Sequence, residues 1–218
     1  MIKRITIFAR RDDLDRHAFS AHWKGRHRAI AAGMPNILGY RQNHGLDAWT
    51  IAGDGFGVDG MAELWFADDA AMAAALASPA AAALPADELN FMRAITLCQI
   101  AEGRRPPTGH ARLILIAGSA TRSASNDPAT RLAEWLGART DLDPRRIAID
   151  RVLATATRET LPGVGSPDVI ASLVLDGMPE ARECASRIVE TARGAPQPFA
   201  SASLLLVDVV TVVPPPFS

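Results

Sequence analysis

The chain has 218 residues, of which 48% are hydrophobic, and its 23 basic and 24 acidic side chains leave a formal net charge of −1 at pH 7. A chain of this length holds one large domain or two ordinary ones, and it can bury a substantial core. The near-zero charge excludes an electrostatic footprint for nucleic acid or an anionic membrane, so we expect small, weakly charged molecules or other proteins as partners.

The two cysteines, Cys98 and Cys184, lie far apart and show no CxxC spacing. We therefore expect neither a disulfide framework nor a zinc module, and a reducing cytoplasm is the expected compartment. The N-terminal stretch MIKRITIFARRDDLDR alternates in polarity and soon becomes charged. This pattern predicts a first strand and is too short in apolar length for a signal peptide or a membrane span.

The first half of the sequence predicts the element order βαββαβ. In chain order we expect a strand over 2–9, a helix over 14–33, strands over 37–46 and 60–66, an alanine-rich helix from Asp68 that is broken near Pro79, and a strand over 94–101. Residues 103–110 combine charge, proline and glycine, which is typical of an exposed connection. The sequence therefore predicts one domain over 1–102 and another over 111–218.

The second half predicts the same element order again. Its expected segments are strands over 112–118, 145–154, 169–175 and 203–213 and helices over 127–139 and 178–192. A shift of about 110 residues lays AEWLGA over AHWKGR, so that Trp135 meets Trp23. We therefore predict an α+β fold of two tandem ferredoxin-like units. The bare apolar faces of their sheets must be covered, which predicts that they close a barrel within one chain.

The first helix presents a narrow apolar stripe at 100° per residue. Phe19, Trp23 and His27 lie in this stripe, so His27 should face inward, whereas His17 and His22 should face water. The histidines follow one another at intervals of five residues, which in an α-helix places successive side chains about 140° apart. This geometry argues against a shared metal, and we expect no metal site.

The inward histidine has two interpretations. It is either a core histidine whose ring nitrogens are satisfied by neighbouring polar groups, or a general acid/base at the floor of a pocket. The second half carries Arg139 where His27 would fall, so the fold itself does not require a histidine there. If one half has lost its function, the first half is the active one.

The next strands offer further polar side chains. Tyr40, Gln42 and His44 alternate onto one face, where they line either a cavity or a solvent-exposed sheet edge. In the following strand Glu63 is a carboxylate among apolar residues. It is either paired with an arginine or placed over the pocket.

Four motifs resemble the EthD family of dimeric α+β barrel proteins. They are FxxHWxxxH over 19–27, GYRQNH over 39–44, DGMAELWF over 59–66 and ADELNF over 86–91. The resemblance spans residues 1–102, and the second half is similar in fold but lacks the motifs. It implies a small-molecule cavity between sheet and helices. The wider superfamily includes lactone isomerases, polyketide cyclases and decarboxylases, cofactor-free monooxygenases of aromatic substrates, and haem-degrading enzymes.

The resemblance also implies candidate residues. The catalytic candidates are His27, Tyr40 and His44; the candidates for substrate binding are Trp23, Gln42, Asp59, Glu63, Trp65 and Phe91. The leading hypothesis is a cofactor-independent isomerase, cyclase or decarboxylase that transfers a proton at His27 on an aromatic, polyketide-like or lactone substrate. The alternatives are a haem- or oxygen-dependent catalyst, with His27 as iron ligand, and a non-catalytic binding protein of a catabolic or biosynthetic pathway. Two such chains are expected to form a homodimer.

Overall fold

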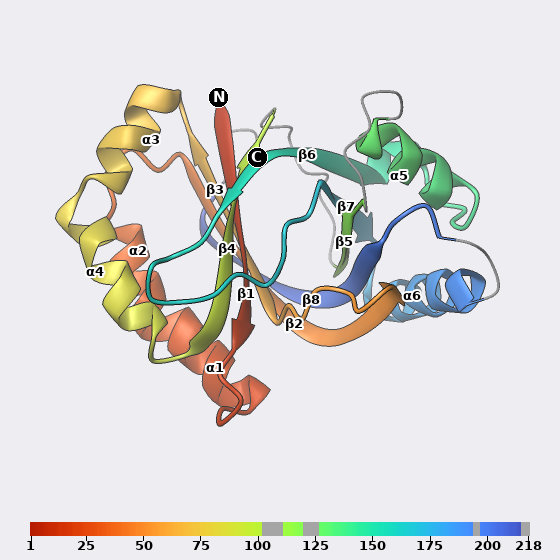
Figure 1. The fold of residues 1–218 in the computed structure, drawn as a ribbon, viewed down its shortest axis with the longest axis horizontal. Helices are drawn as coiled ribbons and strands as arrows, with labels where there is room; N and C mark the ends of the chain where they lie inside the picture. Colours follow the sequence, from red (N-terminus) through yellow and green to blue (C-terminus); the bar gives the residue numbers. More distant parts are fainter. Residues whose placement is uncertain (102–110, 120–126, 194–196, 215–218) are drawn as a thin grey trace.

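The computed structural model describes residues 1–101, 111–119, 127–193 and 197–214, which form an α+β fold around one closed antiparallel barrel (Figure 1). The first half contains, in chain order, β1 (Ile2–Arg10), α1 (Arg16–His22), a π-helical segment (Trp23–His27), α2 (Arg28–Ala32), β2 (Gly39–Ala52), β3 (Gly60–Phe66), α3 (Asp69–Leu76), α4 (Pro79–Glu88) and β4 (Met92–Ile100). The second half contains β5 (Ala111–Gly118), α5 (Pro128–Gly137), a 3₁₀ turn (Pro144–Arg146), β6 (Ile147–Ala156), β7 (Val169–Leu175), α6 (Met178–Arg193) and β8 (Ser201–Val213). The expected linker over 103–110 lies outside the described residues.

The barrel joins the two halves through hydrogen-bonded strands. Its order is β1-β3-β2-β8-β5-β7-β6-β4, with β4 paired to β1. The halves meet at two seams, where β2 pairs with β8 and β4 pairs with β6. Each of these strands therefore has a neighbour on both sides, which leaves the barrel without an open sheet edge. The predicted α+β class and barrel are confirmed, whereas the identity of the halves as two copies of one ferredoxin-like unit stays a prediction.

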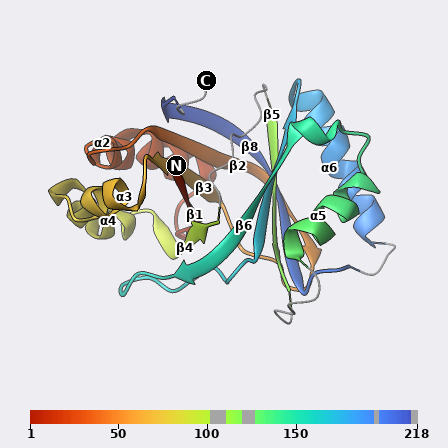
Figure 2. The same ribbon diagram turned by 90° about the horizontal axis from the view of Figure 1, so that it is seen from above.

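The helices form two separate layers outside the barrel. Helices α1, α2, α3 and α4 cover the side built by the first half, and α5 and α6 cover the opposite side (Figures 1 and 2). Each strand between these layers therefore has one face toward the barrel interior and one toward a helix layer. Strands β5 and β7 are buried at every position, which explains their nearly continuous apolar sequences.

Alternation along β1 separates the two environments. Ile5 and Ile7 belong to the apolar core inside the barrel, whereas Phe8 packs with the aromatic residues of α1 on the outside. Because side chains in a strand alternate, Lys3 also points into the barrel and Arg4 points toward the helices. Neighbouring residues of one strand therefore serve two different sites.

A network of ions occupies part of the barrel interior. Lys3 Nζ lies 2.9 Å from Glu63 Oε1 and also contacts Asp150. Arg112 Nη1 donates to Glu63 Oε2 at 2.9 Å, and Arg41 Nη1 lies 3.5 Å from the same oxygen. Burial opposes the negative charge of Glu63, but the three surrounding cations outweigh it and lower the pKa of the carboxyl. The network keeps a buried charge paired, which a barrel interior requires.

Two predicted helices are divided in the structure. The expected helix over 14–33 consists of α1, the π-helical segment and α2, and the alanine-rich helix consists of α3 and α4. The second break occurs at Ser78, whose hydroxyl accepts a hydrogen bond from Ala81 N and caps α4, with Pro79 at the first helical position. A capping serine followed by proline is a strong helix start, and the break expected near Pro79 is confirmed.

Among the described residues, no single helix is long and apolar enough to cross a membrane. The pair α3 and α4 meets the length and composition test only when taken together, and it is bent by 62° at the break.

We expect Glu63→Gln to destabilise the fold strongly. The substitution leaves three cations in the barrel interior with Asp150 as their remaining carboxylate, and breaking a buried ion pair costs about 3–5 kcal/mol. Chemical denaturation measures the change in the free energy of unfolding. Glu190→Gln, at an exposed position of α6, is the matched control and should change stability by less than about 0.5 kcal/mol. Equal stabilities of the two variants would contradict the structural role of the network.

Candidate functional site

His27 lines a cavity between the outer face of the barrel and the helix layer of the first half. The cavity has a volume of about 60 Å³ and is mostly apolar. Its polar lining residues are Arg4, Thr6, His27, Tyr40, Glu88 and Arg158. His27 is 7% exposed, so the prediction that it faces inward is confirmed.

The His27 ring is held by a buried carboxylate. Its Nδ1 lies 3.0 Å from Asp87 Oδ2 at the end of α4, and its ring meets that of Phe91 edge-on with centroids 4.9 Å apart. A carboxylate only accepts hydrogen bonds, so Nδ1 carries the proton and donates it to Asp87. In the neutral ring, Nε2 is then the atom with a free lone pair.

Electrostatics keeps this pair in the form that a general base needs. Burial lowers the pKa of His27, and the nearby Asp87 offsets this only in part, so the ring is neutral near pH 7. Burial opposes the charge of Asp87, but the hydrogen bonds from His22 and His27 outweigh it and lower the pKa of the carboxyl. A neutral imidazole oriented by a carboxylate is an arrangement suited to accepting a proton.

Asp87 is also bound by two other side chains. His22 Nε2 lies 3.2 Å from both of its oxygens, and Arg26 Nε lies 3.0 Å from Oδ1. Asp87 is not among the residues predicted from the sequence, although it lies in the ADELNF motif four residues before Phe91. The sequence did contain a signal for this pair. The motif holds an acidic residue and the first helix holds three histidines, and an acidic side chain is a common partner for an imidazole.

The expected position of His22 is wrong. The prediction of about 140° between His22 and His27 assumed an α-helix, but the chain over Trp23–His27 is a π-helix. In a π-helix residues five apart lie about one turn apart, so both histidines reach the same carboxylate. His22 is partly buried, lies against Asp87 and stacks on Phe91 with ring centroids 4.8 Å apart. Short π-helical segments occur often at functional sites.

The polar residues of β2 form a second chain of hydrogen bonds that ends at the cavity. Gln42 Nε2 donates to the Trp23 carbonyl at 3.1 Å and to the Tyr40 hydroxyl at 2.9 Å. Gln42 Oε1 therefore faces His44 Nε2, 3.0 Å away, and this nitrogen must be the donor. Because β2 pairs with both β3 and β8, the solvent-exposed edge considered for these residues is excluded, and their side chains are buried.

His44 positions this chain and stays a neutral imidazole, with its proton on Nε2. Its Nδ1 accepts from the Ser20 hydroxyl at 3.0 Å, and its ring lies 4.0 Å from that of Trp23. Burial, together with the neighbouring Lys24, lowers the pKa of His44 to about 3, so the ring is neutral at physiological pH. Tyr40 accepts from Gln42, which leaves its own O–H free to donate, and burial raises the pKa of this hydroxyl. Of Tyr40, Gln42 and His44, Tyr40 is the one that lines the cavity, so it is the hydrogen-bond donor available there.

Glu63, Trp65 and Asp59 lie apart both from the cavity beside His27 and from the hydrogen-bond chain of Tyr40. Glu63 and Trp65 point into the barrel, on the other side of the sheet, where the cations Lys3 and Arg41 lie over the Trp65 ring. Asp59 pairs with Arg10 at 3.3 Å and does not line the cavity. Of the two interpretations of Glu63, the ion pair with arginine is correct. Phe91, by contrast, contacts the His27 ring, and Trp23 lines the same cavity as His27.

The second half contributes directly to this site. Arg158, in the segment after β6, holds Glu88 through two contacts of 2.9 Å, and Leu161 joins the aromatic cluster around Trp23. The segment is fixed to β4 by the hydrogen bond from Ile95 N to Pro162 O at 2.8 Å. Sequence reasoning assigned the site to the first half alone and missed this contribution, which depends on the β4–β6 seam.

We expect the stability of the protein to fall in mild acid because of His44. Its folded-state pKa of about 3 lies below the unfolded value of about 6.5, so the unfolded chain binds more protons within this window. The free energy of unfolding should therefore fall as the pH is lowered from 6.5 toward 3, by up to about 1.4 kcal/mol per pH unit. Urea denaturation at several pH values measures the slope, which should be smaller in His44→Gln. The control His17→Gln, at an exposed position, should keep the slope of the unaltered protein; an unchanged slope in His44→Gln would refute the buried neutral state.

Metal ligands were also sought. In the part of the chain that the structure describes, no group of three or more His, Cys, Asp or Glu side chains is arranged to hold a metal ion.

Comparisons with known proteins place this geometry in context. No curated protein matches the sequence significantly. An anthrone oxidase-like protein of known structure is similar over 97% of this chain and 93% of its own, with 12% sequence identity and a TM-score of 0.57. A proposed monooxygenase of Fusobacterium nucleatum is similar over 95% of this chain and 91% of its own, with 9% identity and a TM-score of 0.52. At sequence identities this low, the two similarities show that these proteins share a fold with this chain.

The family comparison concerns the first half. An EthD family protein from Bacillus halodurans is similar over 48% of this chain and 99% of its own, with 18% identity and a TM-score of 0.34. The sequence model of the EthD domain matches residues 11–94, a range that includes His27, Asp87 and Phe91. The EthD resemblance predicted from the motifs is therefore confirmed for residues 11–94 of this chain.

Proposed function

We propose that this protein is an enzyme that transfers a proton on a small aromatic, polyketide-like or lactone substrate, with His27 as general base and without a bound cofactor. The observation that carries the proposal is the buried Asp87–His27 pair, whose free ring nitrogen belongs to a cavity-lining residue. The reaction would be an isomerisation, a cyclisation or a decarboxylation, because each of these proceeds through a carbanion or enolate that a base and a hydrogen-bond donor can manage.

The proposed step begins at a carbon next to a carbonyl group. The C–H bond breaks, its proton moves to His27 Nε2, and its electron pair passes to the carbonyl oxygen. Asp87 holds the ring and favours the positive charge that His27 then carries, since it accepts from Nδ1 at 3.0 Å. Return of the proton to the same or another carbon completes an isomerisation and restores the neutral base.

Tyr40 would stabilise the oxygen on which charge develops. Tyr40 lines the same cavity as His27, and its hydroxyl accepts a hydrogen bond from Gln42, so its proton is directed elsewhere. Donors that are fixed before the reaction stabilise a developing oxyanion without a cost of reorganisation. Gln42 and His44 act through Tyr40 and are positioning residues. The walls of the cavity, which include Trp23, Phe8 and Leu97, exclude water and suit an apolar substrate.

The available space limits the size of the substrate. About 60 Å³ lies next to His27, which is less than the 300–1,000 Å³ usual for pockets that hold drug-sized ligands. A second cavity of about 240 Å³ shares Arg4 and Leu97 with the first one. The reacting part of the substrate would enter the small cavity, and the rest would occupy the larger one.

A second candidate function is binding without turnover. The larger cavity favours it, because the two reactive side chains in its lining are held in unreactive states. The Lys3 amine is held by two carboxylates. Burial raises the pKa of the Cys98 thiol to about 12. A binding protein of this kind would retain ligands in the larger cavity and convert none of them.

The relation between the halves also supports one site per chain. We infer that they are two copies of a ferredoxin-like unit, because the strand orders β4-β1-β3-β2 and β8-β5-β7-β6 correspond. In the second copy Arg139 lies over the Trp135 ring at 4.5 Å, at the place of His27, and the helix is packed into an apolar core. The domain boundaries, a homodimer of such chains and a cytoplasmic compartment stay predictions.

We expect His27→Gln to lose proton transfer. Exchange of the acidic C–H of 2-tetralone, a ketone, or 2-coumaranone, a lactone, for deuterium in D₂O is followed by NMR. Because a general base contributes about 10²- to 10⁴-fold, the catalysed exchange should fall by that factor in His27→Gln and persist in the exposed control His17→Gln. Equal exchange by the unaltered protein and the folded His27 variant would exclude the role, and binding of both probes without exchange would favour the second candidate.

Asp87→Asn tests the partner of the base. The amide oxygen that this substitution introduces can still accept from Nδ1 of His27, but it carries no charge, and Asp87 is a group that raises the pKa of His27. The pH at which exchange reaches half of its maximum should therefore move to lower pH, together with a slower maximal rate. Asp141→Asn, which removes an exposed charge in the second half, is the control and should leave the profile in place. A profile that does not move in Asp87→Asn would contradict the proposed pair.

A further inference from the structure

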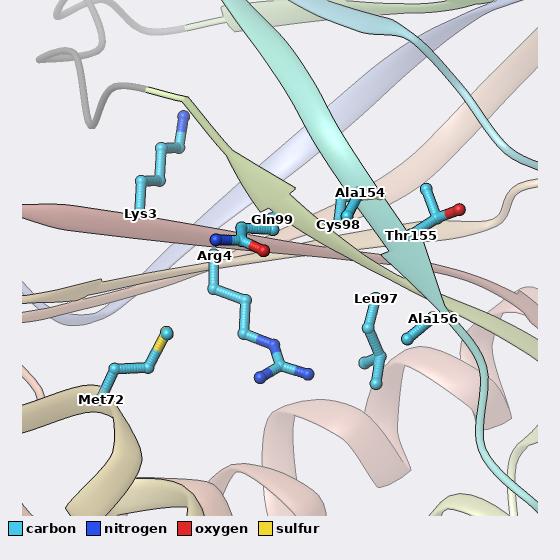
Figure 3. Close-up of a pocket in the computed structure, with 9 residues that line it drawn as sticks. All are labelled: Lys3, Arg4, Met72, Leu97, Cys98, Gln99, Ala154, Thr155 and Ala156. Atoms are coloured by element: carbon cyan, nitrogen blue, oxygen red, sulfur yellow. The ribbon is translucent and has the colours of Figure 1, made fainter. Parts of the chain in front are cut away.

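Arg4 is a cation that has no charged partner of its own among the described residues, and it lies at the junction of the two cavities. It extends from the outer face of β1, and it lines both the cavity of about 240 Å³ and the cavity beside His27. Figure 3 shows Lys3 and Arg4 pointing to opposite sides of β1, with the guanidinium of Arg4 in the space between Met72 and Leu97. The described residues provide the Arg4 side chain with no hydrogen bond and no ion pair.

The surroundings of Arg4 do not compensate its charge. Glu88 is the carboxylate whose charge acts on it, but both Glu88 oxygens are already held by Arg158 at 2.9 Å. Burial, together with Arg158, lowers the pKa of Arg4, which means that the site disfavours the cation as it stands. A partly buried guanidinium without a counter-ion is costly unless an anion arrives.

The other ionisable side chains that line the two cavities do not neutralise the positive charge of Arg4. Lys3 is bound by Glu63 and Asp150 on the inner side of the barrel. Cys98 is a neutral thiol, because burial raises its pKa to about 12, and His27 is a neutral imidazole. The combined space therefore carries one excess positive charge, located at Arg4.

The remaining lining of the larger cavity determines what else the ligand contains. Met72, Leu97, Ala154 and Ala156 supply apolar contacts, and Gln99 and Thr155 add neutral polar groups (Figure 3). A planar guanidinium matches a carboxylate through two parallel hydrogen bonds. The apolar lining suits an aromatic ring or a similar body.

We propose that Arg4 is the anion-binding residue of one extended site and that the ligand of this site is a small organic acid, with a carboxylate on an aromatic or otherwise apolar body. The carboxylate binds Arg4, and the body extends along Leu97, which both cavities share, toward His27. This inference deepens the proposed function and rests on it for the role of His27, but the anion site itself requires no proton transfer.

The test compares an acid with its neutral isostere. Calorimetric titration at pH 7.5 gives the dissociation constants of 2-naphthoate and 2-naphthamide for the unaltered protein and for Arg4→Gln, Arg4→Lys and Arg145→Gln. A hydrogen-bonded charge pair predicts that the acid binds at least about tenfold more tightly than the amide. Arg4→Gln should reduce this preference to about one, Arg4→Lys should retain part of it, and the exposed control Arg145→Gln should retain it fully.

The folding of the variants is checked by thermal unfolding. Because Arg4 has no ion pair with a described residue to lose, Arg4→Gln should have an unchanged or higher Tm, and 2-naphthoate should raise the Tm of the unaltered protein but not that of the variant. Equal affinity of the unaltered protein for acid and amide, binding of neither, or a preference that survives in Arg4→Gln overturns the proposal.

The outcomes separate this inference from the proposed function. Deuterium exchange that depends on His27, combined with equal affinity for acid and amide, overturns the anion site alone. An acid preference that depends on Arg4, combined with exchange that is unaffected in His27→Gln, overturns proton transfer alone and supports a binding protein for organic acids.

Discussion

The two hydrogen-bonded seams, β2 with β8 and β4 with β6, are the constraint on which the rest of the structure depends. They close the barrel, so every strand has one face toward the interior and one toward a helix layer. The cations and carboxylates inside, around Glu63, are paired with one another and stabilise the barrel. The polar groups outside, around His27, line a cavity. The same alternation along β1 sends Lys3 to the first group and Arg4 to the second.

The seams also explain why the site needs the whole chain. The β4–β6 seam brings Arg158 and Leu161 over the helices of the first half, where one pairs with Glu88 and the other packs near Trp23. In the second half the corresponding helix packs into an apolar core that includes Trp135 and Leu136. The second half thus supports and partly encloses a site whose polar groups come mostly from the first half.

The candidate site combines groups whose environments differ sharply. His27 is neutral and held by a charged Asp87, Tyr40 stays protonated and is oriented by Gln42, and Arg4 remains a cation without an ion-pair partner among the described residues. The proposed base, donor and anion-binding group line two cavities that share Arg4 and Leu97, and in the proposed function they act together on an apolar organic acid. The π-helical turn is essential to this set, because it brings a second histidine to Asp87 and thereby fixes the carboxylate that orients His27.

The sequence by itself determined the α+β class, the inward position of His27 and the shared face of Tyr40, Gln42 and His44, because local periodicity fixes which side of a helix or strand a residue occupies. It also contained the EthD motifs. Only the tertiary structure decided the partners: that Asp87 holds His27, that Glu63 is locked inside the barrel, and that no described residue supplies a counter-ion to Arg4. These depend on contacts between residues far apart in the chain and on a π-helical turn, and neither follows from the periodicity of an ideal helix or strand.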